Sequence, residues 1–347
     1  MKVNIKLTNP KDRSYNVLID ELKELKFSTK AAIITNPTVA KFHLDEVKSL
    51  IKSDELYVIT IPDGEKYKNM DTIEFILNEC FKHRLDRKSI LIALGGGVIG
   101  DMTGFAASIF QRGIEFVQIP TTVLSQVDAS VGGKTGVNSK YGKNLIGSFW
   151  QPKAVHCETK FLKTLPKREF NAGIAEIIKM AVTFNAEFFK WLEKCDLRSE
   201  SDLKTAILKS IETKAKVVSL DEREAGVRAV LNYGHTFAHV IENETKYKVF
   251  LHGEAVSIGM VMANELALRL GLMSSEEAIR IKYLLQRYEL PTDYEIKSAD
   301  DFYEHFFLDK KSNKNKITFV LAKGIGDYEM KKDIDKSLIM DILRDFE

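Results

Sequence analysis

Four short apolar runs in the first half of the chain are separated by segments with helical spacing. The runs are AAIIT (31–35), LYVITI (56–61), SILIAL (89–94) and FVQIP (116–120). Between the second and third runs, MDTIEFILNECFKH (70–83) repeats its apolar residues every three or four positions, as an amphipathic helix does. Strands that alternate with helices predict a mainly parallel sheet covered on both faces. Ligands of such a sheet gather at the carboxyl ends of its strands.

The pattern changes after Pro152. From about residue 165 helical spacing dominates, and KITFVLA (316–322) is the clear late strand. Because 347 residues are enough for two hydrophobic cores, we expect two domains. The first, at 1–155, is predicted to be a Rossmann-like α/β domain that binds a cofactor. The second, at 156–347, is predicted to be mostly α-helical, with the active site in the cleft between the two.

The composition is that of a globular protein without a polyanionic partner. The 51 Lys and Arg residues nearly balance the 49 Asp and Glu residues, so nothing indicates a nucleic-acid binder. The three cysteines are far apart and form no C-x-x-C pattern, which is typical of a reducing compartment. The chain begins with the alternating, strand-like pattern VNIKL (3–7), and it has no apolar run long enough to span a bilayer. We therefore expect a cytoplasmic protein that binds neither nucleic acid nor membrane.

A glycine-rich turn follows the third apolar run. It consists of Gly95-Gly96-Gly97-Val98-Ile99-Gly100-Asp101 and leads into a helical segment. Glycines between a strand and a helix let the backbone approach a phosphate, and the helix N-terminus offers unpaired N–H groups. A dinucleotide pyrophosphate suits this turn, although its spacing is not G-x-G-x-x-G and it can be a tight turn alone. Asp101 is expected either to bind a hydroxyl of a ligand or to cap the helix.

The segment 119–147 is polar and contains little that would fill a core. Its Gly-Gly-Lys-Thr and Gly-Lys-Asn units predict loops that present lysines to an anion, with a flexible linker as the alternative. It is not a Walker A loop, because Asp128 stands where the first glycine of that motif belongs. An anionic small molecule is therefore expected here.

The stretch from Arg228 to Glu254 carries an unusual set of polar residues among apolar neighbours. Arg228, Asn232, His235 and His239 are four, three and four residues apart, so one helix would place them on one face. We expect this face of a buried helix to point into a cavity.

Two sets of metal ligands are open on spacing alone. Glu176 with His235 and His252 is a set of the kind that holds catalytic Zn²⁺. The alternative pairs His235 with His239, but the zinc-protease motif H-E-x-x-H needs a glutamate where Thr236 stands. Glu176 can also form a simple i, i+3 salt bridge with Lys179.

Six segments together resemble the 3-dehydroquinate synthases, in the sugar-phosphate cyclase group. They are GGGVIGD, IPTTVLSQVDASVGGKTGVN, GKNLIGSFWQP, TLPKREFNAGIAEIIK, DEREAGVRAVLNYGHTFAHVIE and LHGEAV. The resemblance spans nearly the whole chain. It implies an enzyme of aromatic amino acid biosynthesis, through the shikimate pathway, that needs NAD and a divalent metal, usually Zn²⁺ with Co²⁺ as a possible substitute. Its reaction would convert 3-deoxy-D-arabino-heptulosonate 7-phosphate to 3-dehydroquinate and phosphate.

The same resemblance implies roles for individual residues. The metal ligands would be Glu176, His235 and His252. The catalytic residues would be Glu224, His239, Lys179, Lys134, Arg228 and Asn232. Substrate contacts would be Arg112, Asp128, Lys134, Asn144, Lys179, Lys214, Arg228, Asn232, His239, Lys310 and Lys311. NAD contacts would be Asn36, Asp63, Gly64, Glu65, Lys66, Lys68, Gly97, Val98, Ile99, Gly100, Asp101, Thr121, Thr122, Lys134, Lys143, Phe161, Leu162, Lys163 and Thr164.

In the family, the residue matching Arg112 reaches the phosphate site of the neighbouring subunit, which implies a homodimer. Three alternatives remain open at this stage. They are a related cyclase acting on a sugar phosphate without a carboxylate, a polyol dehydrogenase with the same two-domain plan, and a non-catalytic NAD-binding protein.

Overall fold

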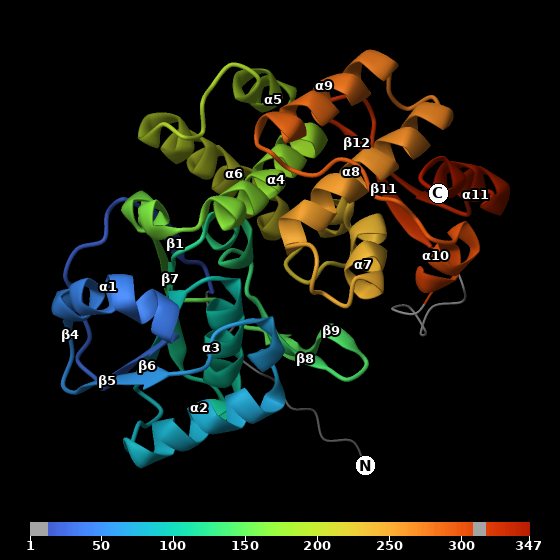
Figure 1. Cartoon of the computed structure of the whole chain (residues 1–347). Helices are drawn as coiled ribbons and strands as arrows, with labels where there is room; N and C mark the ends of the chain where they lie inside the picture. The colour runs from blue at the N-terminus through green and yellow to red at the C-terminus, as the bar shows by residue number, and fades with distance from the viewer. Residues whose placement is uncertain (1–12, 308–316) are drawn as a thin grey trace, which may run out of the picture.

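Six parallel strands form the main sheet, in the order β1, β10, β7, β6, β3, β5 (Figure 1). The computed structural model describes residues 13–307 and 317–347. The strands are β1 Asn16–Ile19, β3 Ala31–Thr35, β5 Leu56–Thr60, β6 Ile90–Gly95, β7 Glu115–Pro120 and β10 Ala154–Cys157. A short parallel pair, β2 Leu25–Lys26 and β4 Ile51–Lys52, lies apart from this sheet.

Helices cover both faces of the sheet. Ala32 and Ile34 of β3 pack with residues of α2 Met70–Lys82 and α3 Gly97–Ile109. Their neighbours Ala31 and Ile33 point to the other face and pack with residues of α1 Pro37–Leu50. Because both faces are buried, the central strands need apolar residues at every position. This explains why these runs are uninterrupted rather than alternating.

The four predicted strands are confirmed, but the sheet is wider than the sequence predicted. β1 and β10 extend it at one edge, and each has only four residues. Such short strands leave too little pattern to be recognised. The VNIKL pattern lies outside the described residues.

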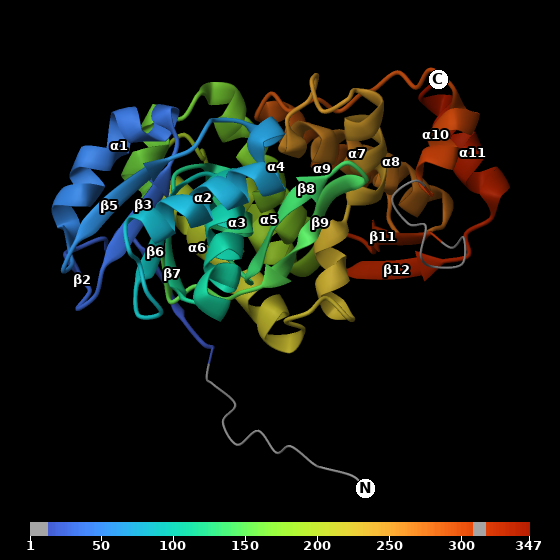
Figure 2. The ribbon, with the colours of Figure 1, turned by 90° about the horizontal axis from the view of Figure 1, so that it is seen from below.

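The polar segment 119–147 was predicted to form loops, and this prediction is wrong for most of its second half. A π-helical turn, η3 Ser125–Ala129, precedes an antiparallel hairpin of β8 Lys134–Ser139 and β9 Gly142–Phe149. Glycines hold the two strands close, since a Cβ on Gly136 would lie 2.4 Å from Ile146 O. The hairpin reaches from the sheet toward α7 (Figures 1 and 2).

The second half is mostly helical, as predicted, and occupies the upper right of Figure 1. Its helices are α4 Lys167–Phe184, α5 Ala186–Leu192, α6 Glu200–Leu220, α7 His235–Glu244, α8 His252–Arg269, α9 Ser275–Arg287, α10 Ala299–His305 and α11 Lys336–Asp345. The 3₁₀ turns of the described residues are η1 Glu65–Tyr67 and η2 Phe110–Arg112 in the first half, and η4 Thr159–Thr164 and η5 Val227–Asn232 in the second. The late strand β11 Thr318–Ala322 is confirmed and pairs with an unpredicted partner, β12 Tyr328–Lys332. None of the described helices is both long and apolar enough to cross a membrane.

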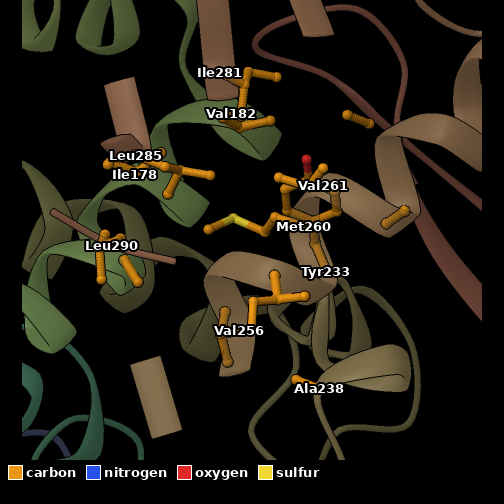
Figure 3. Packing of buried hydrophobic residues seen from close by; sticks show 14 of the residues in the cluster. Ile178, Val182, Tyr233, Ala238, Val256, Met260, Val261, Ile281, Leu285 and Leu290 are labelled. Carbon is orange, nitrogen blue, oxygen red and sulfur yellow. The ribbon is translucent and has the colours of Figure 1, made fainter. Parts of the chain in front are cut away.

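Helix α8 runs through the core of the second half, where Val256, Met260 and Val261 pack among side chains of neighbouring helices (Figure 3). Two glycines bring it unusually close to its neighbours. A Cβ on Gly253 would lie 1.8 Å from Ala172 O of α4, and one on Gly259 would lie 2.1 Å from Gly234 O. The absence of a side chain at these two positions therefore lets α4, α7 and α8 approach at backbone distance.

The prediction of a single helix from Arg228 to His239 is wrong. Arg228 and Asn232 lie in the 3₁₀ turn η5, whereas His235 is the first residue of α7. Gly234 separates the two elements with a φ of 79°, in the left-handed region that glycine adopts without strain. The four polar residues therefore belong to two elements that meet at this turn.

Candidate active site

Three potential metal ligands meet where α4, α7 and α8 come together. Glu176 lies in the middle of α4, while His235 and His252 are the first residues of α7 and α8. The Nε2 atoms of His235 and His252 lie 3.8 Å and 3.7 Å from Glu176 Oε1. Within the described residues this is the one group of three such side chains whose ligand atoms all lie within 4.8 Å of one another. Two imidazoles and a carboxylate are a donor set that suits Zn²⁺.

Each histidine is oriented by a contact at its other ring nitrogen. His235 Nδ1 lies 3.1 Å from the backbone oxygen of Tyr233. His252 Nδ1 lies 3.3 Å from Glu242 Oε1. Both oxygens accept hydrogen bonds, so we assign the proton of each neutral ring to Nδ1 and leave the Nε2 lone pair for a metal.

Glu176 fits a cation-binding role. It is fully buried, and neither of its carboxylate oxygens accepts a hydrogen bond from the described residues. The ammonium group of Lys179 lies against Oε2 and is the ion-pair partner on the same helix. A buried carboxylate without hydrogen bonds is costly unless a positive charge balances it. Lys179 supplies that charge at Oε2, and a divalent cation between Oε1 and the two histidines would give the second oxygen a cationic partner as well.

The environment shifts the pKa values of His235 and His252 in opposite directions. Burial, followed by the charge of Lys179, lowers the pKa of His235 well below its ordinary value. His235 is therefore neutral at pH 7, as a metal ligand must be. Burial also acts to lower the pKa of His252, but its hydrogen bond to Glu242 and the charges of Glu242 and Glu176 outweigh it and raise the pKa.

The geometry separates the two ligand sets that spacing left open. His239 lies one turn beyond His235 on α7, with its ring edge-on and 5.7 Å away between centroids. The ligand atoms of His235 and His252 converge on Glu176 instead. His239 thus lies beside the candidate metal site without belonging to the set of three.

A cluster of charged groups for binding an anion lies next to the triad. Lys214 of α6 is buried and pairs with the partly buried Asp128 of η3 at 2.5 Å. Burial acts to raise the pKa of Asp128, but the charges of Lys214 and Lys179 outweigh it and hold this pKa well below its usual range. Burial lowers the pKa of Lys214 against the opposing charge of Asp128. The site therefore holds two buried lysines, Lys214 and Lys179, each paired with a carboxylate of its own.

Arg228 and Asn232 come from η5, next to α7. The Arg228 side chain is 1% exposed and donates to Gly132 O at 3.0 Å and to Glu222 O. Asn232 Nδ2 donates to Glu224 Oε1 at 3.0 Å, and Lys134 pairs with the other oxygen of Glu224. These contacts connect η5 to the hairpin and to the turn before it.

Several of the predicted cofactor residues lie at the carboxyl edge of the sheet. Asn36 follows β3 and donates to Asp63 Oδ1 at 2.8 Å. Lys68 contacts Asp101 Oδ2 at 2.5 Å and Asn144 Oδ1 at 2.6 Å. Asp101 comes from the glycine-rich turn, so the segments after β3, β5 and β6 and the start of β9 meet at this edge.

The glycine-rich turn has the predicted strand-turn-helix form. Gly95 ends β6, and α3 begins at Gly97 with no described side chain capping its first turn. A Cβ on Gly96 would lie 3.1 Å from Thr122 Cγ2, so the turn passes close to the residues that follow β7. Close backbone approach and free N–H groups at a helix start suit a pyrophosphate.

Some residues predicted to contact NAD have side chains that point elsewhere. Ile99, Phe161 and Leu162 are buried in hydrophobic clusters, so only their backbone groups can face a cofactor. Lys163 is exposed and pairs with Glu200 at 2.9 Å.

The structure does not bring every predicted residue into this site. Arg112 is exposed and ends η2, just beyond the carboxyl end of α3. The 13 residues of α3 therefore separate it from Gly97, a length of about 20 Å. Lys310 and Lys311 lie outside the described residues.

Two polar residues that were not among the predicted site residues also belong to the site region. Glu242 contacts His252 and Lys143. Asn138 donates to Glu65 Oε1 at 2.8 Å and accepts from Asn144 N at 2.9 Å. The signal for Glu242 was present, because it stands seven residues after His235 and so shares a helix face with it.

A surface hollow of about 510 Å³ lies elsewhere, beside Arg168, Phe250 and Glu254. None of the metal-ligand or lysine residues of the site lines it. The candidate active site is therefore the region where side chains converge around Glu176, and not this hollow.

Comparisons with known proteins agree on one family. The family model described as 3-dehydroquinate synthase N-terminal matches residues 58–172, and the corresponding C-terminal model matches residues 173–312. The 3-dehydroquinate synthase of a Nitratiruptor species is 63% identical over 347 residues, covering 100% of this chain and 99% of the relative.

Solved structures show the same architecture. ValA, the 2-epi-5-epi-valiolone synthase from Streptomyces hygroscopicus subsp. jinggangensis 5008, was solved with NAD⁺ and Zn²⁺ bound. It matches with a TM-score of 0.89 and 26% identity, covering 99% of both chains. A 2-deoxy-scyllo-inosose synthase complexed with carbaglucose-6-phosphate, NAD⁺ and Co²⁺ matches with a TM-score of 0.81 and 25% identity, covering 92% of this chain and 91% of that one.

Proposed function

Because this chain belongs to the 3-dehydroquinate synthase family, we propose that it converts 3-deoxy-D-arabino-heptulosonate 7-phosphate to 3-dehydroquinate and phosphate. It is an NAD- and metal-dependent enzyme of the shikimate pathway. One structural observation carries this assignment: the triad of Glu176, His235 and His252 lies beside a cluster of buried cationic side chains. The substrate has both a carboxylate and a phosphate, and such a lining offsets the cost of removing two anions from water.

NAD and a divalent cation supply the chemistry that side chains lack. When bound, NAD⁺ supplies a hydride acceptor and donor for C5 of the substrate, and the cation supplies positive charge for the C5 oxygen. Glu176, His235 and His252 would hold the metal, since their potential ligand atoms converge. The NAD contacts of this chain are its residues at the carboxyl edge of the sheet, including Asn36, the turn Gly97 to Asp101, and Lys143.

The chain's own residues bind the substrate and move its protons. Oxidation of C5 acidifies the neighbouring C–H, which allows phosphate to leave by β-elimination. After C5 is reduced again, the ring opens and an intramolecular aldol reaction closes the carbocycle. We assign proton transfer to His239 and Glu224, at an imidazole nitrogen and a carboxylate oxygen. Holding the open chain in a cyclisable shape is a task of positioning.

Several cations and amides are assigned to the substrate anions. Those within the described residues are Lys134, Asn144, Lys179, Lys214, Arg228 and Asn232, and Asp128 contacts a hydroxyl. The structure supports this set, because Lys214, Lys179 and Arg228 are all buried near the triad. The assignment of Lys310 and Lys311 stays a proposal outside the described residues.

Three wider assignments are also proposals. We assign a homodimer in which Arg112 reaches the neighbouring active site; its place beyond the far end of α3 supports this, because it is remote from the cofactor turn of its own chain. We place the domain division at 155/156, before the helical half begins. A cytoplasmic location is in keeping with three free, buried cysteines.

One assay tests the activity. The full-length protein is incubated with the heptulosonate phosphate, a trace of NAD⁺ and Zn²⁺, while phosphate release and NADH absorbance are followed. We expect phosphate release over many turnovers without accumulation of NADH, because the hydride is returned in each cycle. Lack of phosphate release would overturn the assignment. Stoichiometric NADH would indicate a polyol dehydrogenase, and turnover of sugar phosphates without a carboxylate would indicate a different cyclase.

A further inference from the structure

Glu242 is a buried carboxylate that the family resemblance left without a role. It lies on α7, and its side chain is 3% exposed. A single oxygen, Oε1, contacts two groups: His252 Nδ1 at 3.3 Å and Lys143 Nζ at 3.0 Å. One carboxylate oxygen therefore joins the start of α8 to the strand β9.

The contact with His252 is the kind that tunes a metal ligand. A carboxylate that accepts from the Nδ1 proton of a ligating imidazole fixes the ring and makes Nε2 a stronger donor. The Nδ1 atom of His235, by contrast, contacts only a neutral backbone oxygen, that of Tyr233. The negative charge of Glu242 thus acts on one ligand of the triad, through a ring whose other nitrogen points to Glu176.

The contact with Lys143 links this metal ligand to the hairpin. Lys143 comes from β9, and its ammonium group also lies 4.1 Å from the ring centroid of Tyr247, just beyond the end of α7. In the proposed function Lys143 is a cofactor contact, and this part of the inference rests on that assignment. A negatively charged cofactor that attracts Lys143 weakens the contact between Lys143 and Glu242. The negative charge of Glu242 then acts more strongly on His252.

We propose that Glu242 is a positioning residue that orients His252 for the metal and connects the metal site to Lys143. NAD and the metal then strengthen each other's binding through Glu242. By linkage, the factor by which NAD tightens metal binding equals the factor by which the metal tightens NAD binding.

The test uses binding measurements on the full-length protein, without turnover. The metal is first removed, and the Zn²⁺ dissociation constant is measured by competition with a chromogenic chelator, with and without saturating NAD⁺. Three proteins are compared: native, Glu242→Gln and Glu244→Gln. Glu244 is a matched control because it lies on the same helix and also contacts a histidine, His305, at 3.4 Å and the hydroxyl of Tyr294 at 2.9 Å, away from the triad.

We expect Glu242→Gln to weaken Zn²⁺ binding about 10- to 100-fold, and Glu244→Gln to leave it unchanged. In the native protein NAD⁺ should tighten Zn²⁺ binding by a factor of about 5 or more, and this effect should be lost in Glu242→Gln. Native-like Zn²⁺ affinity in Glu242→Gln would overturn the positioning role. An undiminished NAD⁺ effect in that variant, or none in the native protein, would overturn the connection to Lys143.

Circular dichroism of the metal-free proteins shows whether each variant folds. If Glu242→Gln does not fold, Glu242→Asp is measured instead, since it keeps the negative charge on a shorter side chain. Its Zn²⁺ affinity should lie below that of the native protein, but the loss should be smaller than that expected for Glu242→Gln. The result is independent of the proposed reaction. A protein that releases no phosphate but loses Zn²⁺ affinity in Glu242→Gln would contradict the function and support this inference.

Discussion

Lys179 and Glu176 form an ion pair three residues apart on α4, and both side chains are fully enclosed in the protein. The ammonium group lies against Oε2, while Oε1 faces the two histidines of the triad. The same carboxylate therefore serves a permanent cation on one oxygen and the metal position on the other.

This pairing predicts opposite effects of Lys179→Met on stability and on metal affinity. Without the ammonium group, the metal-free variant leaves Glu176 buried and uncompensated, which should destabilise it by about 3 to 5 kcal/mol. Zn²⁺ should restore most of this loss and should bind more tightly than to the native protein, because a neighbouring positive charge is gone. Thermal unfolding with and without Zn²⁺ measures both effects. An equal loss of stability in the two conditions would contradict the competition between Lys179 and the metal.

Substitution of the histidines should separate metal binding from proton transfer. His252→Ala removes a ligand and should lose both bound metal and turnover. His239→Ala should keep full metal content and lose turnover, because His239 lies beside the triad but outside it. Metal analysis of the purified variants, together with phosphate release, tests this. If His252→Ala keeps full metal content, the ligand set is wrong.

The metal-free protein should show a pH-dependent contribution from the pair of Glu242 and His252. Burial acts to raise the pKa of Glu242, but the hydrogen bond to His252 and the nearby positive charges lower it from 4.5 to about 2. Its ionised form therefore stabilises the fold above about pH 4.5, and this is lost as the pH falls toward 2. The pKa of His252 is raised above 6.5, so its charged form stabilises the fold below pH 6.5 and this is lost as the pH rises through the folded-state pKa.

Glu242→Gln should therefore lower the unfolding temperature of the metal-free protein most between pH 4.5 and 6.5. At its maximum, the loss in the free energy of unfolding should be on the order of a few kcal/mol. Melting curves with chelator at acidic, mildly acidic and alkaline pH give the profile. A difference that is constant with pH would show that Glu242 acts through packing alone.

Mixing of inactive subunits tests the assigned role of Arg112. Arg112→Ala and His239→Ala should each be inactive by themselves. In a mixed dimer, the site of the Arg112→Ala subunit has its own His239 and receives Arg112 from the partner chain, so it is intact. Random mixing of equal amounts should restore about a quarter of native activity. No recovery in verified mixed dimers would place Arg112 in the site of its own subunit, and native-like activity of Arg112→Ala by itself would place Arg112 outside the chemistry.

The sequence predicted the central sheet well for a physical reason. Strands such as β3 and β6 are buried on both faces, so their residues are apolar throughout and easy to recognise. The hairpin of β8 and β9 was not recognisable, because it is rich in glycines and polar residues and, of its residues, only Val137 belongs to a described hydrophobic cluster. The helix break at Gly234 was also missed, since spacing carries no information on the sign of φ.

The site was predicted in parts. Spacing brought His235 and His239 together, but it could not choose between His239 and the distant Glu176, which the fold brings in from α4. The family resemblance made that choice, and the geometry agrees with it. Glu242 was available to spacing, as it shares the face of His235 and His239 on α7. Its contact with the metal site is indirect, through His252, so a pattern of direct ligands does not include it.

The turn at Gly234 has a consequence for how such enzymes diversify. It divides the polar stretch into η5, which carries Arg228 and Asn232, and α7, which carries His235. If Arg228 and Asn232 bind the substrate as proposed, changes in η5 can alter which anionic group of a sugar is recognised without moving the residues proposed to hold the metal. A helix continuous from Arg228 to His239 would transmit every such change to the metal. Because the chain changes direction at Gly234, the residues proposed to bind the substrate can change in evolution while those proposed to hold the metal stay in place.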